Sequence, residues 1–274
     1  MNTETRRTAI MDRLAHGDIL SYQELADLFK KSSMTIRRDV ENLCQRGVAI
    51  KTLGGVRGIG PSSSLYETPL ASRLASQRAE KRAIARCAAG LMVPGQTIYL
   101  DGGTTCIELA KYLATHGIDM TILSNSALVC MELGRGRQYK IIGIGGQYEP
   151  ANLCFVGPTA EDFARKFFVD VAFFSTKGFL PEEGTFESFE PTYRIKQIVV
   201  EQCSQAVLLA DHTKFGERSL CKVLDIEQIH TVVTDELTPR EHLVELERRK
   251  RRVRMATVQG RSSELGKEEA DHAA

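Results

Sequence analysis

The chain has 274 residues, of which 42% are hydrophobic, and a formal net charge of +1 at pH 7. This length and this hydrophobic content allow two domains with buried cores, and the charge excludes a polycation that binds nucleic acid through its overall charge. Seven cysteines occur without CxxC pairs or metal-ligand spacing, which favours reduced thiols over a disulfide scaffold or a zinc site. Because no apolar leader or membrane-length apolar run is present, we expect a cytoplasmic protein without metal or cofactor.

The first 57 residues carry the pattern of a helix-turn-helix. Residues 6–16 have apolar side chains on one helical face, and Ser21-Tyr-Gln-Glu24 is a capping box that begins a second helix. Lys30–Ser32 is a short turn, after which Ser33 is the expected N-cap of a third helix that runs to Arg46. Two short helices joined by a tight turn are typical of domains that place a helix in the DNA major groove.

The third helix has a buried face and a polar face. Ile36, Val40 and Leu43 recur at helical spacing and predict the buried face. The polar positions at its start suit base edges and phosphate oxygens, because that end of a recognition helix enters the groove. The candidate DNA contacts on this segment are Ser32, Ser33, Met34, Thr35, Arg37 and Arg38.

A hairpin follows the third helix. Residues 48–53 alternate like a strand, Gly54-Gly55 is a turn signal, and the return strand begins at Val56. This hairpin is the expected wing, with Lys51 and Arg57 placed to touch the DNA backbone. An ordinary helical hairpin with a solvated basic face is the alternative, but the capped helices, the short turn and the glycine pair together favour a winged helix-turn-helix.

The segments Ser33-Met-Thr-Ile-Arg-Arg-Asp-Val40 and Leu53-Gly-Gly-Val-Arg57 resemble the deoxyribose-regulator (DeoR) family of bacterial repressors. The resemblance implies a sequence-specific transcriptional regulator that binds a double-stranded DNA operator. It also implies that the remainder of the chain contains an effector-binding domain.

A boundary follows at residues 58–64, which are rich in Gly, Pro and Ser. After a helical segment at 66–91, strands and helices alternate through residues 65–238, which predicts an open, mainly parallel α/β sheet. The fold class is therefore α/β, with an N-terminal winged helix-turn-helix at residues 1–57. Strands are expected at residues 97–100, 120–123, 139–144, 171–174, 206–209 and 231–234.

Each expected strand ends in a small polar or glycine-rich loop, where ligands bind in open α/β sheets. Asp101-Gly-Gly-Thr-Thr105 is the strongest candidate phosphate cradle, because two glycines let backbone amides converge at a helix N-terminus. Lys177, Lys196 and Lys214 lie on or after later strands and can converge on the same anion. The alternatives are a plain tight turn and surface lysines.

The family resemblance continues over residues 65–236 and implies an effector domain similar to ribose-5-phosphate isomerase, whose members typically sense phosphorylated sugars. It implies the following effector contacts: Asp101, Gly102, Gly103, Thr104, Thr105, Asn125, Ser126, Lys196 and Lys214.

Two segments depart from the family pattern, namely Ser175-Thr-Lys-Gly178 and Phe189-Glu190. With Phe186 and Tyr193 nearby, they favour a larger or less usual effector, although core packing explains aromatic residues equally well. Lys177 stands where the isomerase-like pattern has an acid, which argues against catalysis, so we expect no catalytic residues. A sugar-phosphate isomerase-like enzyme with an accessory DNA-binding domain remains the alternative, and a nucleoid-type protein without an effector is a third hypothesis.

Residues 239–274 are expected to form a basic, disordered tail, apart from a helix-like segment at Glu241–Glu247. Its run Arg248–Arg254 either adds non-specific DNA affinity or is a solvated charged end. The sequence thus predicts a repressor of a catabolic operon whose DNA binding is modulated by a phosphorylated sugar or related metabolite. A homodimer or homotetramer is expected, because paired half-sites multiply the affinity of a small DNA reader.

Overall fold

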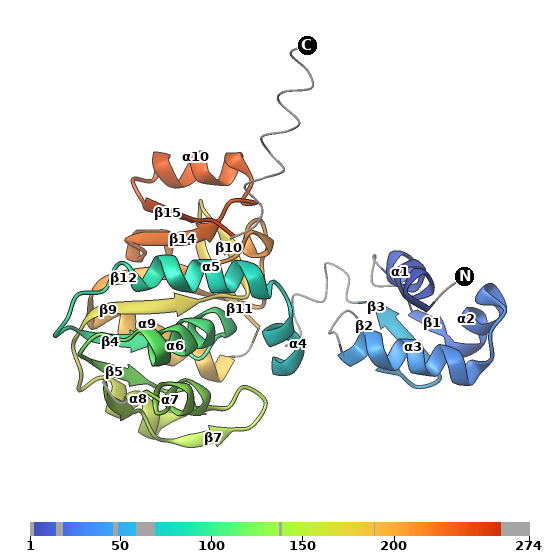
Figure 1. The fold of residues 1–274 in the computed structure, drawn as a ribbon, viewed down its shortest axis with the longest axis horizontal. Helices are drawn as coiled ribbons and strands as arrows, with labels where there is room; N and C mark the ends of the chain where they lie inside the picture. Colours follow the sequence, from blue (N-terminus) through green and yellow to red (C-terminus); the bar gives the residue numbers. More distant parts are fainter. Residues whose placement is uncertain are drawn as a thin grey trace, which may run out of the picture. The chain divides into compact units, whose positions relative to one another are not determined.

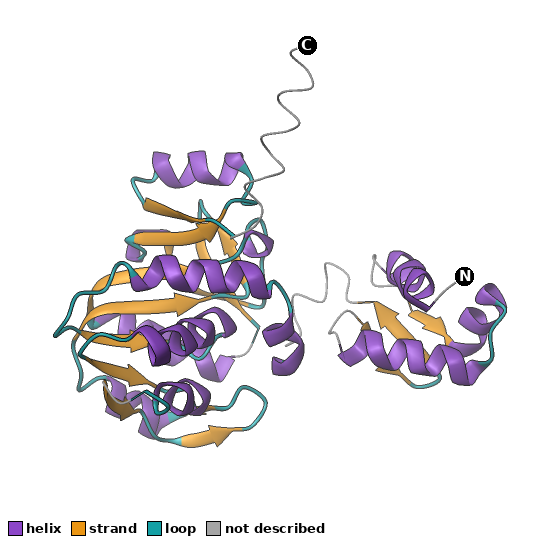
Figure 2. Cartoon of the chain, viewed as in Figure 1, coloured by secondary structure: helices purple, strands orange, loops and turns teal. Residues whose placement is uncertain are grey.

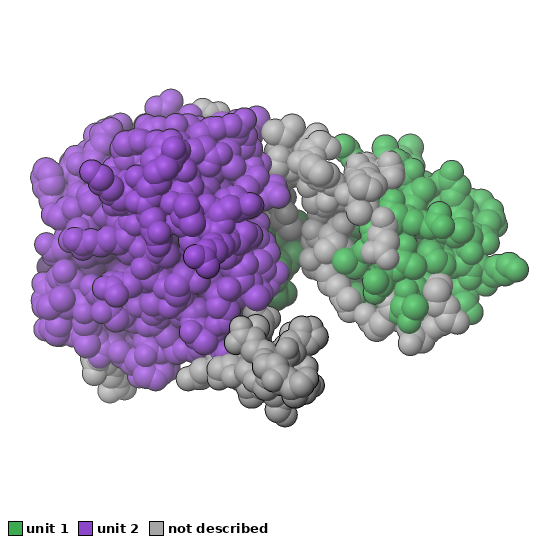
Figure 3. Space-filling view, turned by 90° about the horizontal axis from the view of Figure 1, so that it is seen from above, with its two compact units in different colours: residues 1–76 green, residues 77–274 purple. Residues whose placement is uncertain are grey.

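The computed structural model describes residues 3–14, 19–45, 49–58, 69–136, 139–188 and 190–258. The chain divides into two compact units, Met1–Ser76 and Gln77–Ala274 (Figures 1 and 3). Each unit has its own sheet and helices (Figure 2). Among the described helices, none is long and apolar enough to cross a membrane.

The first unit is a winged helix-turn-helix, as predicted. A three-stranded antiparallel sheet in the order β1-β3-β2 packs with three helices, and strand β1 lies between the first two helices. In chain order the elements are α1 (Thr3–Leu14), β1 (Ile19–Ser21), α2 (Tyr22–Phe29), α3 (Ser33–Gln45), β2 (Ala49–Thr52), β3 (Gly55–Gly58) and α4 (Leu70–Ala75).

The core of this unit follows the predicted periodicity. Ile36, Val40 and Leu43 of α3 are fully buried and pack with apolar residues of α1, α2 and the sheet. Asp39, on the same side of α3, is also buried, and its two carboxylate oxygens accept from the Nε atoms of Arg6 at 2.6 Å and Arg7 at 3.1 Å. A buried carboxylate needs such partners, so these arginines of α1 fix the orientation of α3.

The second unit is built on a seven-stranded parallel sheet in the order β15-β14-β12-β9-β4-β5-β6. Helices α5, α6 and α7 cover one face and α8 and α9 the other (Figure 1). The strands are β4 (Thr97–Leu100), β5 (Met120–Ser124), β6 (Tyr139–Gly143), β9 (Val169–Ser175), β12 (Cys203–Leu209), β14 (Thr231–Asp235) and β15 (Arg252–Ala256). The helices are α5 (Arg78–Ala89), α6 (Thr104–His116), α7 (Ala127–Leu133), α8 (Pro158–Ala164), α9 (Glu190–Glu201) and α10 (Arg240–Arg248).

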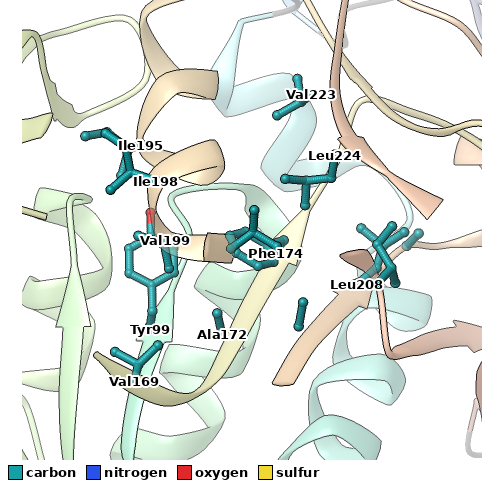
Figure 4. Packing of buried hydrophobic residues seen from close by; sticks show 14 of the residues in the cluster. Tyr99, Val169, Ala172, Phe174, Ile195, Ile198, Val199, Leu208, Val223 and Leu224 are labelled. Atoms are coloured by element: carbon teal, nitrogen blue, oxygen red, sulfur yellow. The ribbon is translucent and has the colours of Figure 1, made fainter. Parts of the chain in front are cut away.

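The core under α8 and α9 holds this sheet and a smaller one together. Tyr99 and Phe174 lie side by side on neighbouring strands, with ring centroids 5.9 Å apart, and Ile195 and Val199 of α9 cover them (Figure 4). Leu224 joins this core from an antiparallel sheet in the order β10-β11-β13, which the sequence reading missed. Its strands are β10 (Gly178–Leu180), β11 (Gly184–Glu187) and β13 (Cys221–Asp225); the remaining elements are the hairpin of β7 (Gln147–Glu149) and β8 (Cys154–Val156) and the 3-10 helices η2 (His212–Lys214) and η3 (Ile226–Gln228).

The helix-like segment at Glu241–Glu247 is confirmed as part of α10, but the predicted disordered tail is wrong for residues 252–256, which form β15. Helix α10 buries Leu246 against the sheet, and β15 pairs with β14 in parallel register at the edge. Arg248 and Arg249 both bind Glu245, at 2.8 and 3.0 Å, so part of the basic run is engaged within the fold. The apolar residues in this segment lie among many charged residues, so the sequence pattern predicted a charged tail instead of an edge strand. Residues 259–274 and most of the predicted linker lie outside the described residues.

Candidate DNA interface and effector site

Helices α2 and α3 both begin on local hydrogen bonds from a serine side chain. Ser21 caps α2, with its Oγ accepting from the Glu24 amide at 3.1 Å and its amide donating to the Glu24 carboxylate at 2.6 Å. Lys30 ends α2 in the left-handed conformation, at φ 50°. Helix α3 is capped by Ser32, whose Oγ accepts from the Thr35 amide at 3.3 Å. The predicted N-cap, Ser33, is therefore wrong by one residue.

The start of α3 presents the predicted DNA-reading side chains. Met34 is 63% exposed, and Arg37 and Arg38 are exposed. With about 100° between successive residues, Met34 and Arg38 lie opposite the buried face that contains Ile36. Arg37 lies on the flank. Among the described residues, neither arginine forms an ion pair, so both guanidinium groups can bind an anion.

The wing carries the two remaining candidate residues, Lys51 and Arg57, and, at its turn, an exposed apolar residue that was not predicted. Lys51 of β2 is exposed, but its Nζ binds the Glu41 carboxylate of α3 at 2.7 Å, which also lowers the pKa of Glu41. Arg57 is half-buried in the central strand β3, where Ile19 and Ile50 flank it in register. Leu53 at the turn is fully exposed. Its exposure and its place at the hairpin tip make it a candidate DNA contact. The sequence analysis did not select it because its side chain is apolar.

The effector candidates gather at the carboxyl edge of the parallel sheet. Asp101 follows β4 and is buried, and its Oδ2 accepts from the amide of Ser175 at 3.1 Å and from the hydroxyl of Ser175 at 2.7 Å. The Nζ of Lys196, on α9, lies 3.1 Å from the same oxygen. Ser175, one of the departures from the family pattern, thus holds the central carboxylate in place.

Lys196 is buried in a cage of acceptors. Its Nζ donates to the backbone oxygen of Ser175 at 2.7 Å and to the carboxylate of Glu187, in addition to its ion pair with Asp101. Burial alone lowers the pKa of Lys196, but the two carboxylates outweigh it and raise that pKa above its ordinary value. The ammonium group therefore stays charged and faces protein acceptors. Glu187 was missed because strand β11, which carries it, was not predicted.

The glycine pair packs tightly against this cage. Gly103 is the N-cap residue of α6, and a Cβ atom placed there would lie 1.7 Å from the Ser175 Oγ. The first helical bond of α6 runs from the Ile107 amide to the Gly103 oxygen at 3.0 Å. The amides of Thr104 and Thr105 precede that bond, so they have no acceptor within the helix, which is what the predicted anion cradle requires.

Asn125 and Ser126 are buried behind the cradle and already bonded. The Asn125 side chain accepts from the Tyr99 hydroxyl at 2.8 Å and donates to the Phe155 oxygen at 3.0 Å. Ser126 caps α7 by accepting from the Val129 amide at 3.3 Å. Both side chains thus shape the loop that lies beside the cradle.

The other two predicted lysines lie in segments that follow strands at the same edge of the sheet. Lys177 follows β9 and Lys214 lies in η2 after β12, and both are half-buried. Phe186 is buried and Tyr193 packs against the core, so packing accounts for these two aromatic residues. Phe189 lies outside the described residues. Among the described residues, no group of acidic, His and Cys side chains is arranged to hold a metal ion.

Comparison with known proteins matches both parts of the chain. Family models for a DeoR-like helix-turn-helix domain and a DeoR C-terminal sensor domain match residues 6–61 and 76–236. The transcriptional repressor AccR of Agrobacterium fabrum is 34% identical over 235 residues, which cover 85% of this chain and 90% of that protein. The repressor CsqR of Escherichia coli is 28% identical, covering 85% and 88%. The L-fucose operon activator of Escherichia coli is also 28% identical, covering 84% and 94%.

A solved ribose 5-phosphate isomerase A from Methanocaldococcus jannaschii aligns with 51% of this chain and 55% of its own. Its TM-score is 0.39 and its sequence identity 16%, which is too little similarity to transfer a function. The sequence relatives are transcriptional regulators, and they match nearly the full length of the chain.

Proposed function

Because the chain belongs to the DeoR family of helix-turn-helix transcriptional regulators, we propose that it represses a catabolic operon and that a phosphorylated sugar controls its affinity for DNA. The matched relatives are regulators, so the chain is a regulator and the isomerase-like enzyme is not favoured. The observation that carries the proposal is the start of α3, which presents two arginines free of acidic partners among the described residues. A sensor domain follows in the same chain.

The exposed side of α3 supplies base and phosphate contacts in this proposal. Arg38 and Met34, opposite the buried face, reach base edges, where an arginine that binds guanine gives about 1–3 kcal/mol of discrimination. Ser32, Ser33 and Thr35 lie at the helix N-terminus, which attracts phosphate oxygens. Lys51 and Arg57 add backbone contacts from the wing.

The carboxyl edge of the large sheet binds the effector in this proposal. The amides at the start of α6 take the phosphate, with Gly102 and Gly103 allowing its close approach. Among the described residues, three groups donate to the Asp101 carboxylate, and all three contact its Oδ2 atom. Its Oδ1 then accepts from a sugar hydroxyl. Lys177 and Lys214 add positive charge from neighbouring loops.

The assembly is proposed to be a homodimer or homotetramer that binds paired half-sites, since two linked readers raise affinity without new contacts. Binding of the effector changes DNA affinity only if the two forms of the protein bind it unequally, typically by about 1–3 kcal/mol. Repression relieved by the effector is the proposed direction.

The test uses the full-length protein and a DNA duplex that it selects from a random pool. Fluorescence anisotropy measures binding with and without each of a panel of phosphorylated sugars. Asp101→Asn is expected to keep wild-type DNA affinity but lose the response to the active sugar. Asp119→Asn, at an exposed aspartate, is the matched control and should respond normally. The effector proposal fails if Asp101→Asn still responds, and the DNA proposal fails if Arg38→Ala binds as the wild type does.

A further inference from the structure

Tyr22 links the three parts of the DNA-binding unit. It is the first residue of α2, where the capping box of Ser21 and Glu24 fixes its backbone. Its amide donates to the oxygen of Gly54, in the turn of the wing, at 3.0 Å. Its side chain is half-buried and packs against the core of the unit. Tyr22 is therefore held by the helix start, the wing and the core at once.

The ring of Tyr22 supports one of the two exposed arginines. The guanidinium carbon of Arg37 lies 4.7 Å from the ring centroid, within the range of a cation–π contact. A stacked guanidinium keeps the N–H groups on its edges available for phosphate oxygens. Because Arg37 makes no hydrogen bond or ion pair with any described residue, the ring is what orders it before DNA arrives.

The neighbouring Arg38 has a different position. At about 100° per residue, Arg38 points away from the buried face while Arg37 lies on one flank of α3. Glu41, one turn after Arg37 on that flank, binds Lys51 of the wing. Arg37 therefore lies on the side of α3 that adjoins the wing, and Arg38 on the side directed out of the unit.

We propose that Tyr22 is a positioning residue that holds Arg37 for a DNA phosphate, which leaves Arg38 as the arginine that reads a base. The inference rests on the proposed DNA interface and divides it into two roles. Fixing Arg37 before binding lowers the conformational entropy lost on binding, so the ring strengthens DNA binding without touching DNA.

The experiment is a double-mutant cycle on the full-length protein with the selected duplex and a random-sequence duplex. Tyr22→Phe keeps the ring and should bind as the wild type does. Tyr22→Leu should weaken binding to both duplexes by about two- to five-fold, the range of an exposed cation–π contact. In the Arg37→Ala background the same change should have no effect, whereas in the Arg38→Ala background it should keep its full effect.

Two further readouts separate positioning from a structural role. Arg37→Ala should lower the slope of log affinity against log salt by about one and leave base preferences intact, whereas Arg38→Ala should relax preference at a defined base pair. Proton NMR should show upfield-shifted Arg37 side-chain signals in the wild type and in Tyr22→Phe, and not in Tyr22→Leu. Tyr22→Met replaces Tyr22→Leu should the latter unfold at a lower temperature.

Several results would overturn the inference. These are wild-type binding by Tyr22→Leu, an equal loss with Tyr22→Phe, a loss that persists in the Arg37→Ala background, or unshifted Arg37 signals. If instead neither Arg37→Ala nor Arg38→Ala changes DNA binding, the proposed interface itself is wrong. The two failures are therefore distinguishable.

Discussion

Replacing Lys196 by methionine should strongly destabilise the second unit. Lys196 is 5% exposed, and its ammonium forms ion pairs with the carboxylates of Asp101 and Glu187. Methionine fills similar volume but removes the cation that lies 3.1 Å from the buried Asp101 carboxylate. Breaking a buried ion pair from one side typically costs about 3–5 kcal/mol. For a unit of about 200 residues, each kcal/mol lowers the Tm by about 2–4 °C, so the expected fall is about 6–20 °C.

Differential scanning calorimetry of the full-length protein measures this fall. Lys222→Met is the control, because its ion pair with Asp225 is exposed and such pairs contribute less than about 1 kcal/mol. Adding Asp101→Asn to Lys196→Met should recover part of the loss, since the buried charge that lost its cation is removed. A Tm for Lys196→Met equal to that of Lys222→Met would refute the view that the ion pair of Lys196 with the buried Asp101 stabilises the second unit.

The pH dependence of this difference has a defined sign. The folded-state pKa of Lys196 lies above its unfolded-state value, because the two carboxylates outweigh the effect of burial. The stability that it contributes is therefore fully present below the unfolded-state pKa and is lost only as pH rises through the folded-state pKa. Between about pH 6 and pH 9 the Tm difference between wild type and Lys196→Met should stay constant.

Three other substitutions or truncations test separate parts of the structure. Gly103→Ala should lower the Tm and abolish the effector response, because the new Cβ would meet Ser175 Oγ at 1.7 Å, and adding Ser175→Gly should restore part of the Tm. Leu53→Ser should leave the Tm unchanged, since the side chain is fully exposed, but should weaken DNA binding in anisotropy titrations if the wing tip contacts DNA. Truncation after Thr238 should unfold the second unit at a much lower temperature, because α10 and β15 are lost and with them the buried Leu246. A calorimetric unfolding transition of the second unit at the wild-type temperature would contradict this.

Local signals explain what the sequence revealed. The capping box at Ser21, the helical spacing of Ile36 and Val40, and the glycine turn of the wing are each written within a few residues, and each was predicted correctly. The six strands expected in the second domain are apolar runs bounded by turn residues, and the structure contains all of them in one parallel sheet. The family resemblance is likewise confirmed by both matched domains.

The site chemistry depends on contacts that local patterns cannot show. The hydrogen bond from Ser175 to Asp101 joins residues 74 positions apart in the chain, and the residues next to them do not indicate that they pair. Glu187 reaches Lys196 from a short antiparallel strand whose pattern is too brief to stand out. In β15 two arginines alternate with apolar residues directly after a basic run, so an edge strand had the appearance of a charged tail.

The ion pair between Asp101 and Lys196 bears on which ligand the edge can take. A carboxylate beside the start of α6 would repel a phosphate, but Lys196 compensates it without occupying the helix amides. The same carboxylate can then accept from a hydroxyl on the ligand that the phosphate anchors. This arrangement favours a phosphorylated sugar over inorganic phosphate, because only the sugar satisfies both groups. Lys196→Met with Asp101→Asn should therefore regain stability yet respond to no sugar phosphate, which separates the structural role of the ion pair from recognition.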